Sequence, residues 1–425
     1  MIFVYRLIAV LLYPCLILLI FFRKFLNKED QFRYKEKIFS SYYSVNRINN
    51  YKLVWFHAAS VGEVQSIFPL IKILNKKNSN LQFLITTITL TSAQLIKKEF
   101  LEYGNITHRY LPLDVFFLTK KFLNLWKPDF IFFIDSEIWP NLILNIREKN
   151  IPLGLINGRV TKKTFRRWKV LPVTAKKIFE SFEFCLASSQ ESKNFLKSLG
   201  AQNVQYIGNI KFSNKIDFKD LKNENEKFLK SKKVWCAAST HQDEDEFSIK
   251  VHVNLKEKIS NLMTIIAPRH IHRSKKIKRI CENYNLEAQI LNEKDTINPN
   301  SEIIIINSFG VLPTFFKHSK SVFVGKSTIK NLENDGGQNP IIAAQLGCKI
   351  YHGPYVYNFR EIYQLLNKNL IANEISSIND LTEKILIDFK DLRDENLPNK
   401  MIEDIGEKIL NETTLKINNK FYEIN

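Results

Sequence analysis

The 425-residue chain is long for a single hydrophobic core, so its length favours two or more domains. Hydrophobic residues make up 45% of it and aromatic residues 12%, a composition that excludes an intrinsically disordered protein. The formal net charge of +19 suits an anionic partner, such as an acidic membrane surface or a phosphorylated substrate, although a generally lysine-rich surface explains it equally well.

Two further classes of partner find no support in the sequence. No helix-turn-helix pattern and no RNA-binding aromatic motif occurs, so we expect no nucleic-acid partner. The five cysteines are odd in number and scattered, without the spacing of zinc ligands. They predict reduced thiols in a cytosolic compartment, not a disulfide framework or a metal site.

The first predicted element is an apolar helix at the amino terminus. The run from Leu7 to Phe22 is apolar on every face and is followed by Arg23 and Lys24. It lacks a signal-peptide cleavage site, and counting Ile2 to Tyr5 gives the roughly 20 residues that a spanning helix needs. We predict a single membrane anchor over residues 1–24, with the basic flank keeping the following domains on the cytoplasmic side. A buried amphipathic helix is the alternative, and the pattern leaves open whether the anchor spans the membrane or lies on it.

Short apolar runs alternate with amphipathic segments along the rest of the chain. The runs are 52–59, 81–90, 129–137, 151–158 and 184–189, then 234–240, 262–270, 302–310, 321–327 and 348–354. Nearly continuous hydrophobic runs of this length are typical of buried parallel strands with helices between them. We predict the α/β class, with two doubly wound, Rossmann-like domains over 25–211 and 233–425 and a polar linker over 212–232. The last helix is free to pack back on the first domain.

Unusual polar residues stand where the predicted strands end. They occupy His57 to Glu63, Asp135 to Asn141, Asn157 to Arg159, Ser239 to His241, Pro268 to His270, Ser308 to Gly310 and Gly336 to Asn339. In open parallel sheets, ligands bind outside the carboxyl ends of the strands. We therefore predict that function lies in a cleft between the two domains.

Glu63 is the most unusual of these residues, because it follows a buried strand at the start of a helix. Ser60 is suited to cap that helix, and a carboxylate in the first turn is favoured by the helix dipole, so a capping role alone explains Glu63. Gly62 and two alanines leave open space beside it, which suits a general base better than a packed core.

Two further stretches of the first half carry charge. If the strand before them continues through Asp135 and Glu137, these acids point to opposite faces and at most one faces the cleft. Asn157 to Lys169 gathers six cations around aromatic residues. Such a stretch suits phosphates or anionic lipid head groups, although a solvated basic face fits equally well.

The second half carries the features of a nucleotide site. Arg269 and His270 follow a strand and suit a phosphate or carboxylate, and Ser308 and Gly310 precede a helix whose backbone N–H groups suit an anion. The turn over 336–339 permits close backbone approach. There is no Walker lysine pattern, no GxGxxG and no carboxylate cluster for a divalent ion, so we expect a metal-free transfer without a cofactor. A cleft with a base on one side and a nucleotide on the other describes a glycosyltransferase of the GT-B architecture.

Taken in order, several motifs resemble those of bacterial 3-deoxy-D-manno-octulosonic acid (Kdo) transferases. They are HAASVGE, TTITLT, DSEIWPN, NGR, GNIKF, AASTHQDE, APRH, GGQNP and GPYVYNF, and the resemblance covers nearly the whole chain from the apolar amino terminus onward. It implies an inverting GT-B enzyme of the bacterial inner membrane. Such an enzyme transfers Kdo from CMP-Kdo, a co-substrate, to a hydroxyl of the tetraacyl disaccharide phosphate precursor of lipid A (lipid IVA), with no metal.

The resemblance also implies roles for individual residues. Glu63 stands at the position of the proposed general base, and Glu137 at the second acid of the family. The acceptor-binding residues are Ser60, Gly62, Glu137 and Arg159, and the residues that hold CMP-Kdo are Lys211, Arg269, His270, Ser308, Phe309, Gly310, Gly337, Asn339 and Asn358.

Three positions depart from the family pattern. Ile342 stands where the family has a glutamate near the nucleotide ribose, Val311 replaces an acid, and Ser92 replaces a glycine. Losing an acid that hydrogen-bonds a ribose weakens donor binding by about 1–3 kcal/mol. Two alternatives therefore stand beside the main expectation: a GT-B transferase that uses another nucleotide sugar, such as a UDP sugar, and a catalytically silent binding protein with the same fold.

Overall fold

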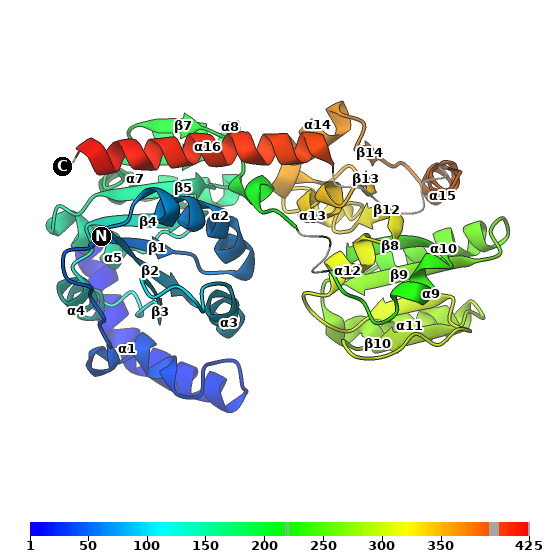
Figure 1. Cartoon of the computed structure of the whole chain (residues 1–425), viewed down its shortest axis with the longest axis horizontal. Coiled ribbons are helices and arrows are strands. Elements are labelled where there is room, and N and C mark those ends of the chain that lie inside the picture. The colour runs from blue at the N-terminus through cyan, green and yellow to red at the C-terminus, as the bar shows by residue number, and fades with distance from the viewer. Residues whose placement is uncertain (217, 219–220, 391–398, 424–425) are drawn as a thin grey trace. The chain divides into compact units, whose positions relative to one another are not determined.

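The computed structural model describes residues 1–216, 218, 221–390 and 399–423, with the side chains of 422 and 423 excepted. The chain forms two compact units (Figure 1). Unit 1 consists of Met1–Asn214 together with Ile405–Asn425, and unit 2 consists of Lys215–Asp404.

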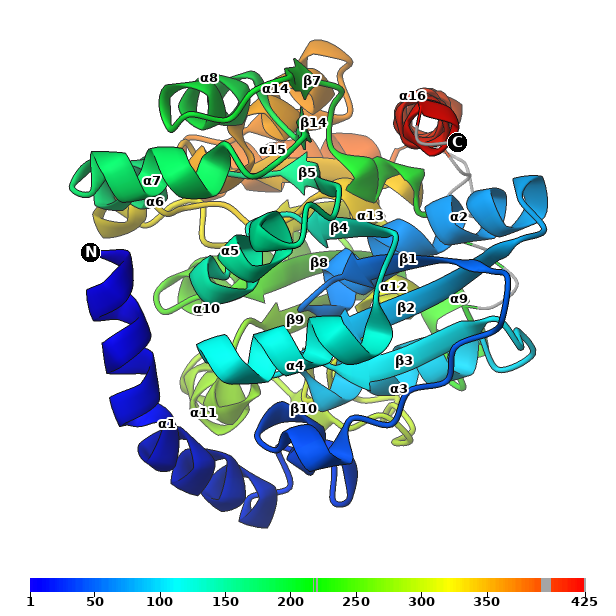
Figure 2. The same cartoon turned by 90° about the vertical axis from the view of Figure 1, so that its left-hand side faces the viewer.

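Unit 1 is built on a seven-stranded sheet in the order β3-β2-β1-β4-β5-β6-β7, in which every pairing is parallel (Figure 2). The strands are β1 (Lys52–His57), β2 (Leu81–Thr87), β3 (Ile106–Tyr110), β4 (Phe130–Ile134), β5 (Leu153–Gly158), β6 (Phe184–Ala187) and β7 (Val204–Tyr206). The helices are α1 (Ile2–Phe25), α2 (Val61–Lys77), α3 (Leu90–Glu99), α4 (Phe116–Trp126), α5 (Pro140–Glu148), α6 (Lys162–Lys169), α7 (Pro172–Phe179), α8 (Gln190–Ser198) and most of α16 (Lys400–Glu423), with 3-10 turns η1 (Arg33–Lys37), η2 (Ser40–Tyr42) and η3 (Ile210–Ser213).

The central strands of unit 1 are apolar throughout because helices cover both faces of the sheet. Trp55, Phe122 and Phe133 are fully or almost fully buried in one cluster on one face. The chain reverses its direction of winding between β1 and β4, which are neighbours in the sheet but not in sequence. This switch point is where ligands bind in open α/β sheets.

The last helix, α16, packs on unit 1 although it follows unit 2 in sequence. The ring of Phe421 lies 4.6 Å from that of Phe130 on β4, and Lys420 pairs with Glu183 at 2.8 Å. Gly406 permits the close approach, because a Cβ there would lie 2.2 Å from the carbonyl oxygen of Phe212.

Unit 2 repeats the plan with a second parallel seven-stranded sheet, in the order β10-β11-β9-β8-β12-β13-β14. Its strands are β8 (Lys233–Thr240), β9 (Leu262–Pro268), β10 (Ala288–Leu291), β11 (Ile303–Ile306), β12 (Ser319–Val324), β13 (Lys349–His352) and β14 (Ala372–Glu374). The helices are α9 (Glu226–Lys230), α10 (Glu244–Lys256), α11 (Ser274–Asn283), α12 (Leu312–Phe316), α13 (Ile341–Gln345), α14 (Arg360–Lys368) and α15 (Ile378–Asp388), with 3-10 turns η4 (Ile271–Arg273), η5 (Lys330–Leu332) and η6 (Tyr357–Phe359). The switch point lies between β8 and β12.

The predicted fold class is confirmed, since both halves are doubly wound parallel α/β units of GT-B type. The ten predicted strands are present, and the short strands β3, β7, β10 and β14 were missed. The predicted linker over 212–232 begins inside η3 (Ile210–Ser213) of unit 1 and contains α9 (Glu226–Lys230), while 217, 219 and 220 lie outside the described residues. The helix α1 is long and apolar enough to cross a membrane.

Candidate active site

The loops after β1 and β4 bring acids together at the switch point of unit 1. Glu63 lies in the first turn of α2 and is almost fully buried. Its Oε2 accepts a hydrogen bond from the Ala59 N–H at 2.8 Å, and its Oε1 accepts one from the Ser60 hydroxyl at 2.8 Å. Ser60 Oγ in turn accepts from the Glu63 N–H, so the two residues form a capping box. The capping interpretation of Glu63 is therefore confirmed as one of its roles.

The surroundings of Glu63 also make it a better proton acceptor. Burial raises the pKa of its carboxyl group, and the negative charges of Asp135 and Glu137 raise it further, against the opposing hydrogen bonds from Ser60 and Ala59. An acid with a raised pKa is suited to take a proton near neutral pH.

The charges of Asp135 and Glu137 both act on Glu63, and the expectation that these two acids point to opposite faces of a continuing strand does not apply. That expectation assumed a continuous strand, but β4 ends at Ile134 and Asp135 has a φ of +63°. A left-handed residue breaks the alternation of side chains, and aspartate is one of the few residue types that tolerate this conformation.

The acids are held in place by groups from η3, from β1 and from the loop after β4 itself. Lys211, on η3, donates to Asp135 Oδ2 at 2.8 Å. The indole N–H of Trp139 donates to Glu137 Oε2 at 2.8 Å, and His57 Nε2 lies 3.3 Å from the same oxygen. We call Glu63, Asp135, Glu137, His57 and Lys211 the Glu63 cluster. Sequence reasoning missed Asp135 and His57 as members, and it assigned Lys211 to the donor site, whereas its side chain lies in this cluster of unit 1.

The remaining predicted acceptor residues of unit 1 adjoin this cluster. A Cβ on Gly62 would meet nothing within 4 Å, so the open space predicted beside Glu63 is present. Arg159 follows β5, and its N–H donates to the carbonyl of Asp135 at 3.0 Å. Ser92, which departs from the family glycine, is buried, and its hydroxyl reaches the Ala59 carbonyl at 3.4 Å.

The switch point of unit 2 is organised by a buried carboxylate that sequence reasoning missed. Glu244 is 1% exposed and lies in the first turn of α10. Its Oε2 accepts from the N–H groups of His241 at 3.0 Å and Lys326 at 2.6 Å. Its Oε1 accepts from the N–H groups of Ser327 and Thr328 and from the Thr328 hydroxyl, at 2.9 to 3.1 Å. One side chain therefore joins the loops after β8 and β12.

Two groups of predicted donor residues stand at the carboxyl ends of β9 and β11. Arg269 and His270 are exposed directly after β9, and no partner of the Arg269 guanidinium is found in the described part of the chain. After β11, Gly310 has a φ of +83° with open space around it, and the ring of Phe309 is 71% exposed. Ser308 is half-buried in the same turn.

The other predicted donor residues shape the turn after β12. Asn339 Oδ1 accepts a hydrogen bond at 3.0 Å from the N–H of Ile341, the first residue of α13. Gly337 has a φ of +88° and donates to the carbonyl of Lys326. The Asn358 amide donates to the Asp335 carbonyl at 2.7 Å, so it holds the turn in place. No group of three or more His, Cys, Asp and Glu side chains suited to a metal ion is found among the described residues.

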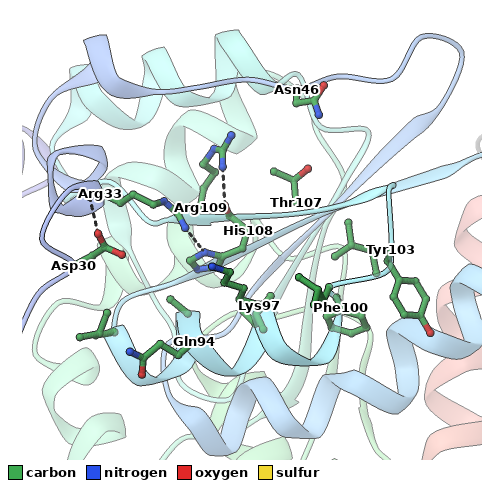
Figure 3. Close-up of a pocket in the computed structure, with 15 residues that line it drawn as sticks. Asp30, Arg33, Asn46, Gln94, Lys97, Phe100, Tyr103, Thr107, His108 and Arg109 are labelled. Atoms are coloured by element: carbon green, nitrogen blue, oxygen red, sulfur yellow. Dashed lines mark hydrogen bonds between the residues drawn. The ribbon is translucent and has the colours of Figure 1, made fainter.

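A separate cavity of about 540 Å³ opens between α3 and β3 at the edge of the unit 1 sheet (Figure 3). Its lining includes Arg33, Lys97 and Arg109. Arg33 and Arg109 both donate to the carbonyl of His108, at 2.9 and 3.0 Å. Burial first, and then these two cations, lower the pKa of His108 to about 3, so its ring is neutral. The arginines thus stabilise the edge strand β3. None of the described residues that line this cavity belongs to the Glu63 cluster.

Comparison with known proteins identifies the family. A family model described as 3-Deoxy-D-manno-octulosonic-acid transferase (kdotransferase) matches residues 32–214. The 3-deoxy-D-manno-octulosonic acid transferase of Rickettsia bellii (strain RML369-C) is 31% identical over 426 residues, which cover 98% of this chain and 99% of the relative. That of Rickettsia typhi (strain ATCC VR-144 / Wilmington) is 34% identical over 344 residues, or 80% of this chain and 72% of the relative.

Among solved structures, the UDP-GlcNAc 2-epimerase from Neisseria meningitidis bound to UDP-GlcNAc aligns with a TM-score of 0.57 at 14% identity, covering 88% of this chain and 100% of that one. At this identity the likeness shows the fold alone, and it agrees with the two parallel sheets described above. The sequence relatives confirm the resemblance inferred from the motifs. The chain therefore belongs to the 3-deoxy-D-manno-octulosonic acid transferase family of glycosyltransferases.

Proposed function

We propose that this protein transfers Kdo from CMP-Kdo to a hydroxyl of lipid IVA, with inversion and without a metal ion, at the cytoplasmic face of the bacterial inner membrane. The observation that carries the proposal is Glu63, a buried carboxyl group of raised pKa at the switch point of unit 1, in a chain of the Kdo transferase family. The two Rickettsia relatives, both 3-deoxy-D-manno-octulosonic acid transferases, support Kdo as the transferred sugar.

In the proposed reaction, Glu63 acts as the general base. It takes the proton of the acceptor hydroxyl while the hydroxyl oxygen bonds to the anomeric carbon of Kdo. The bond from that carbon to the phosphate oxygen of CMP breaks, and CMP leaves with the electron pair. Attack from the face opposite CMP inverts the anomeric configuration. Asp135 and Glu137 favour protonation of Glu63 through their charge.

The donor is expected to bind unit 2. The exposed guanidinium of Arg269 is suited to the phosphate, because it offers a bidentate fork of donors. The exposed ring of Phe309 offers an apolar surface for the base, and the open backbone at Gly310 permits close approach.

The test is a transfer assay with purified full-length protein, CMP-Kdo generated in situ and tetraacyl lipid A precursor, read by mass spectrometry. A product heavier than the acceptor by whole Kdo units supports the proposal, and its mass counts the sugars added. Absence of product from folded protein contradicts it. Competition of CMP against UDP for binding then separates a Kdo transferase from a transferase that uses a UDP sugar.

Gly62→Ala tests whether the acceptor approaches the backbone beside Glu63. Because an added Cβ meets no protein atom, the fold is expected to gain about 0.5–1 kcal/mol in free energy of unfolding. A ligand that uses this space is displaced, and displacement on the order of 1 Å lowers the transfer rate by about 100-fold. Thermal unfolding and initial rates are measured together. Gly104→Ala is the matched control, since its Cβ also meets nothing within 4 Å. Unchanged transfer in Gly62→Ala would show that the substrate does not use this space.

Ile342→Glu tests the departure from the family on α13. Restoring an acid that hydrogen-bonds a ribose is expected to tighten CMP binding by about 10-fold, within the 1–3 kcal/mol of such a bond. Isothermal titration with CMP measures the dissociation constant, with Ile342→Leu as the control for side-chain volume. If the affinity of Ile342→Glu equals that of the control, the reduced donor affinity attributed to Ile342 is refuted.

A further inference from the structure

The apolar helix α1 carries two different faces along its whole length. Partly or fully buried residues recur along the side of the helix that faces unit 1: Ile2, Arg6, Ala9, Tyr13, Leu16, Ile17, Ile20, Phe21, Arg23 and Lys24. On the outside, a second stripe is exposed: Phe3, Leu7, Leu11, Leu18, Phe22 and Phe25. A helix period of 3.6 residues makes each set a continuous stripe.

Tyr5 and Arg6 make polar contacts with the rest of unit 1 near the first turns of α1. The Tyr5 hydroxyl donates to Asp114 Oδ2 at 2.8 Å, and Arg6 pairs with Glu148 at 3.1 Å. Asp114 also accepts from the backbone N–H groups of Asn141 and Leu142, so it belongs to the polar start of α5. These are polar and charged groups of an α/β unit, and the hydrocarbon core of a bilayer excludes such groups.

Contacts of the same kind continue to the other end of the helix. The Tyr13 hydroxyl donates to the carbonyl of Ile38, and Ile20 is buried against Tyr34 and Ile38. Arg23 pairs with Glu29 at 2.7 Å. Arg6 and Arg23 are about 25 Å apart along a helix of this pitch, close to the roughly 30 Å of a hydrocarbon core. One unit outside the membrane cannot contact both ends of a helix that crosses it.

The charges around α1 suit an anionic lipid surface. The exposed Lys28 follows the apolar run, and at the first turn a cavity of about 470 Å³ is lined by Arg147 and by Lys177 of α7. Figure 2 shows α6 and α7 on the same side of unit 1 as the start of α1. The helix α6 has no buried residue and contributes five further cations, with Val170 exposed at its end.

We infer that α1 does not cross the bilayer but lies in the plane of an anionic membrane surface. Its inward stripe is docked on unit 1, and its outward stripe enters the boundary between head groups and acyl chains. This goes beyond the proposed function, which requires only that the protein be anchored, and it places the amino terminus on the same side of the membrane as unit 1.

Sidedness tests the inference directly. The full chain carries one protease-cleavable epitope tag before Met1 and another after Asn425, and it is studied in sealed inside-out and right-side-out membrane vesicles. We expect protease to remove both tags from the same side. Removal of the amino-terminal tag only from the opposite side would show that α1 spans the membrane and would overturn the inference. Removal of either tag does not depend on transferase activity. A failure of this inference can therefore be distinguished from a failure of the proposed function.

Cross-linking tests the docking in the membrane. Cys15 is the exposed cysteine and the other four are buried. The cysteine pairs are therefore introduced into a Cys15→Ser variant, which has no exposed native cysteine. A short bis-maleimide is expected to join Arg6→Cys to Glu148→Cys in intact vesicles, but not Leu11→Cys, on the outward stripe, to Glu148→Cys. Equal yields from the two pairs would contradict docking of the inward stripe.

The lipid composition of vesicles tests whether the positive charges around α1 contribute to membrane binding. The purified full chain is incubated with phosphatidylcholine vesicles, with and without phosphatidylglycerol, and separated by flotation. We expect several-fold more bound protein with phosphatidylglycerol and a loss of this difference at high salt. Equal binding to the two vesicle types would overturn the anionic part of the inference.

Discussion

Glu63→Gln is expected to lower the rate of Kdo transfer by about 10²–10⁴-fold while leaving unit 1 folded. Glutamine also completes a capping box, so the amide oxygen can still accept from the Ala59 N–H. What is lost is the capacity to accept a proton. Initial rates measured by mass spectrometry and the unfolding midpoint of the same preparation check both halves of this expectation.

The pH profile adds a second readout for Glu63. A base must be ionised to act, and burial with two neighbouring acids raises the pKa of Glu63 above its ordinary value. The transfer rate is therefore expected to fall as pH decreases through this raised pKa, and Glu63→Gln should lose that acidic limb. Glu99→Gln, on α3 and paired with Lys72, is the control and should keep both rate and profile. A Glu63→Gln enzyme with wild-type rates would rule out the base.

Glu244→Ala is expected to lower the free energy of unfolding by about 3 kcal/mol and to weaken CMP binding strongly. The substitution removes the acceptor of four buried or partly buried N–H groups and a hydroxyl, and each buried donor left unpaired costs about 1–3 kcal/mol before water or relaxation compensates. The loops after β8 and β12 then lose their common anchor. Thermal unfolding and isothermal titration with CMP measure the two effects.

Two further variants make the expectation for Glu244 specific. Glu244→Gln keeps one carbonyl oxygen but presents an amide N–H₂ to the other donors, so its effects should be intermediate. Glu246→Gln removes a charge from the same helix turn, where the side chain is exposed and pairs with Lys250, and it should change neither measurement. If Glu244→Ala binds CMP as the wild type does, the carboxylate does not organise the donor site.

The fold and part of the site were predictable because their signals are local in sequence. Buried parallel strands are continuous apolar runs, so β1, β4, β8 and β9 were found, whereas β3 and β7, which are short and partly polar, were missed. The capping box of Ser60 and Glu63 spans only one helical turn, and Gly62 beside it marked open space. Strand ends share one edge of a sheet, so polar residues after strands predict a ligand site at that edge.

The tertiary structure alone decided which of these residues meet. Asp135 joins Glu63 because its left-handed φ ends the strand alternation, and it pairs with Lys211, 76 positions away. Glu244 reaches Ser327 across 83 positions. The packing of α1 on unit 1 was likewise visible only in the tertiary structure. A run of apolar residues indicates that a helix is removed from water, but not which surface it contacts. The length, composition and hydrophobic period of a segment determine which helix or strand it forms. Side-chain pairing depends on how helices and strands far apart in sequence pack together, and no local sequence pattern contains that information.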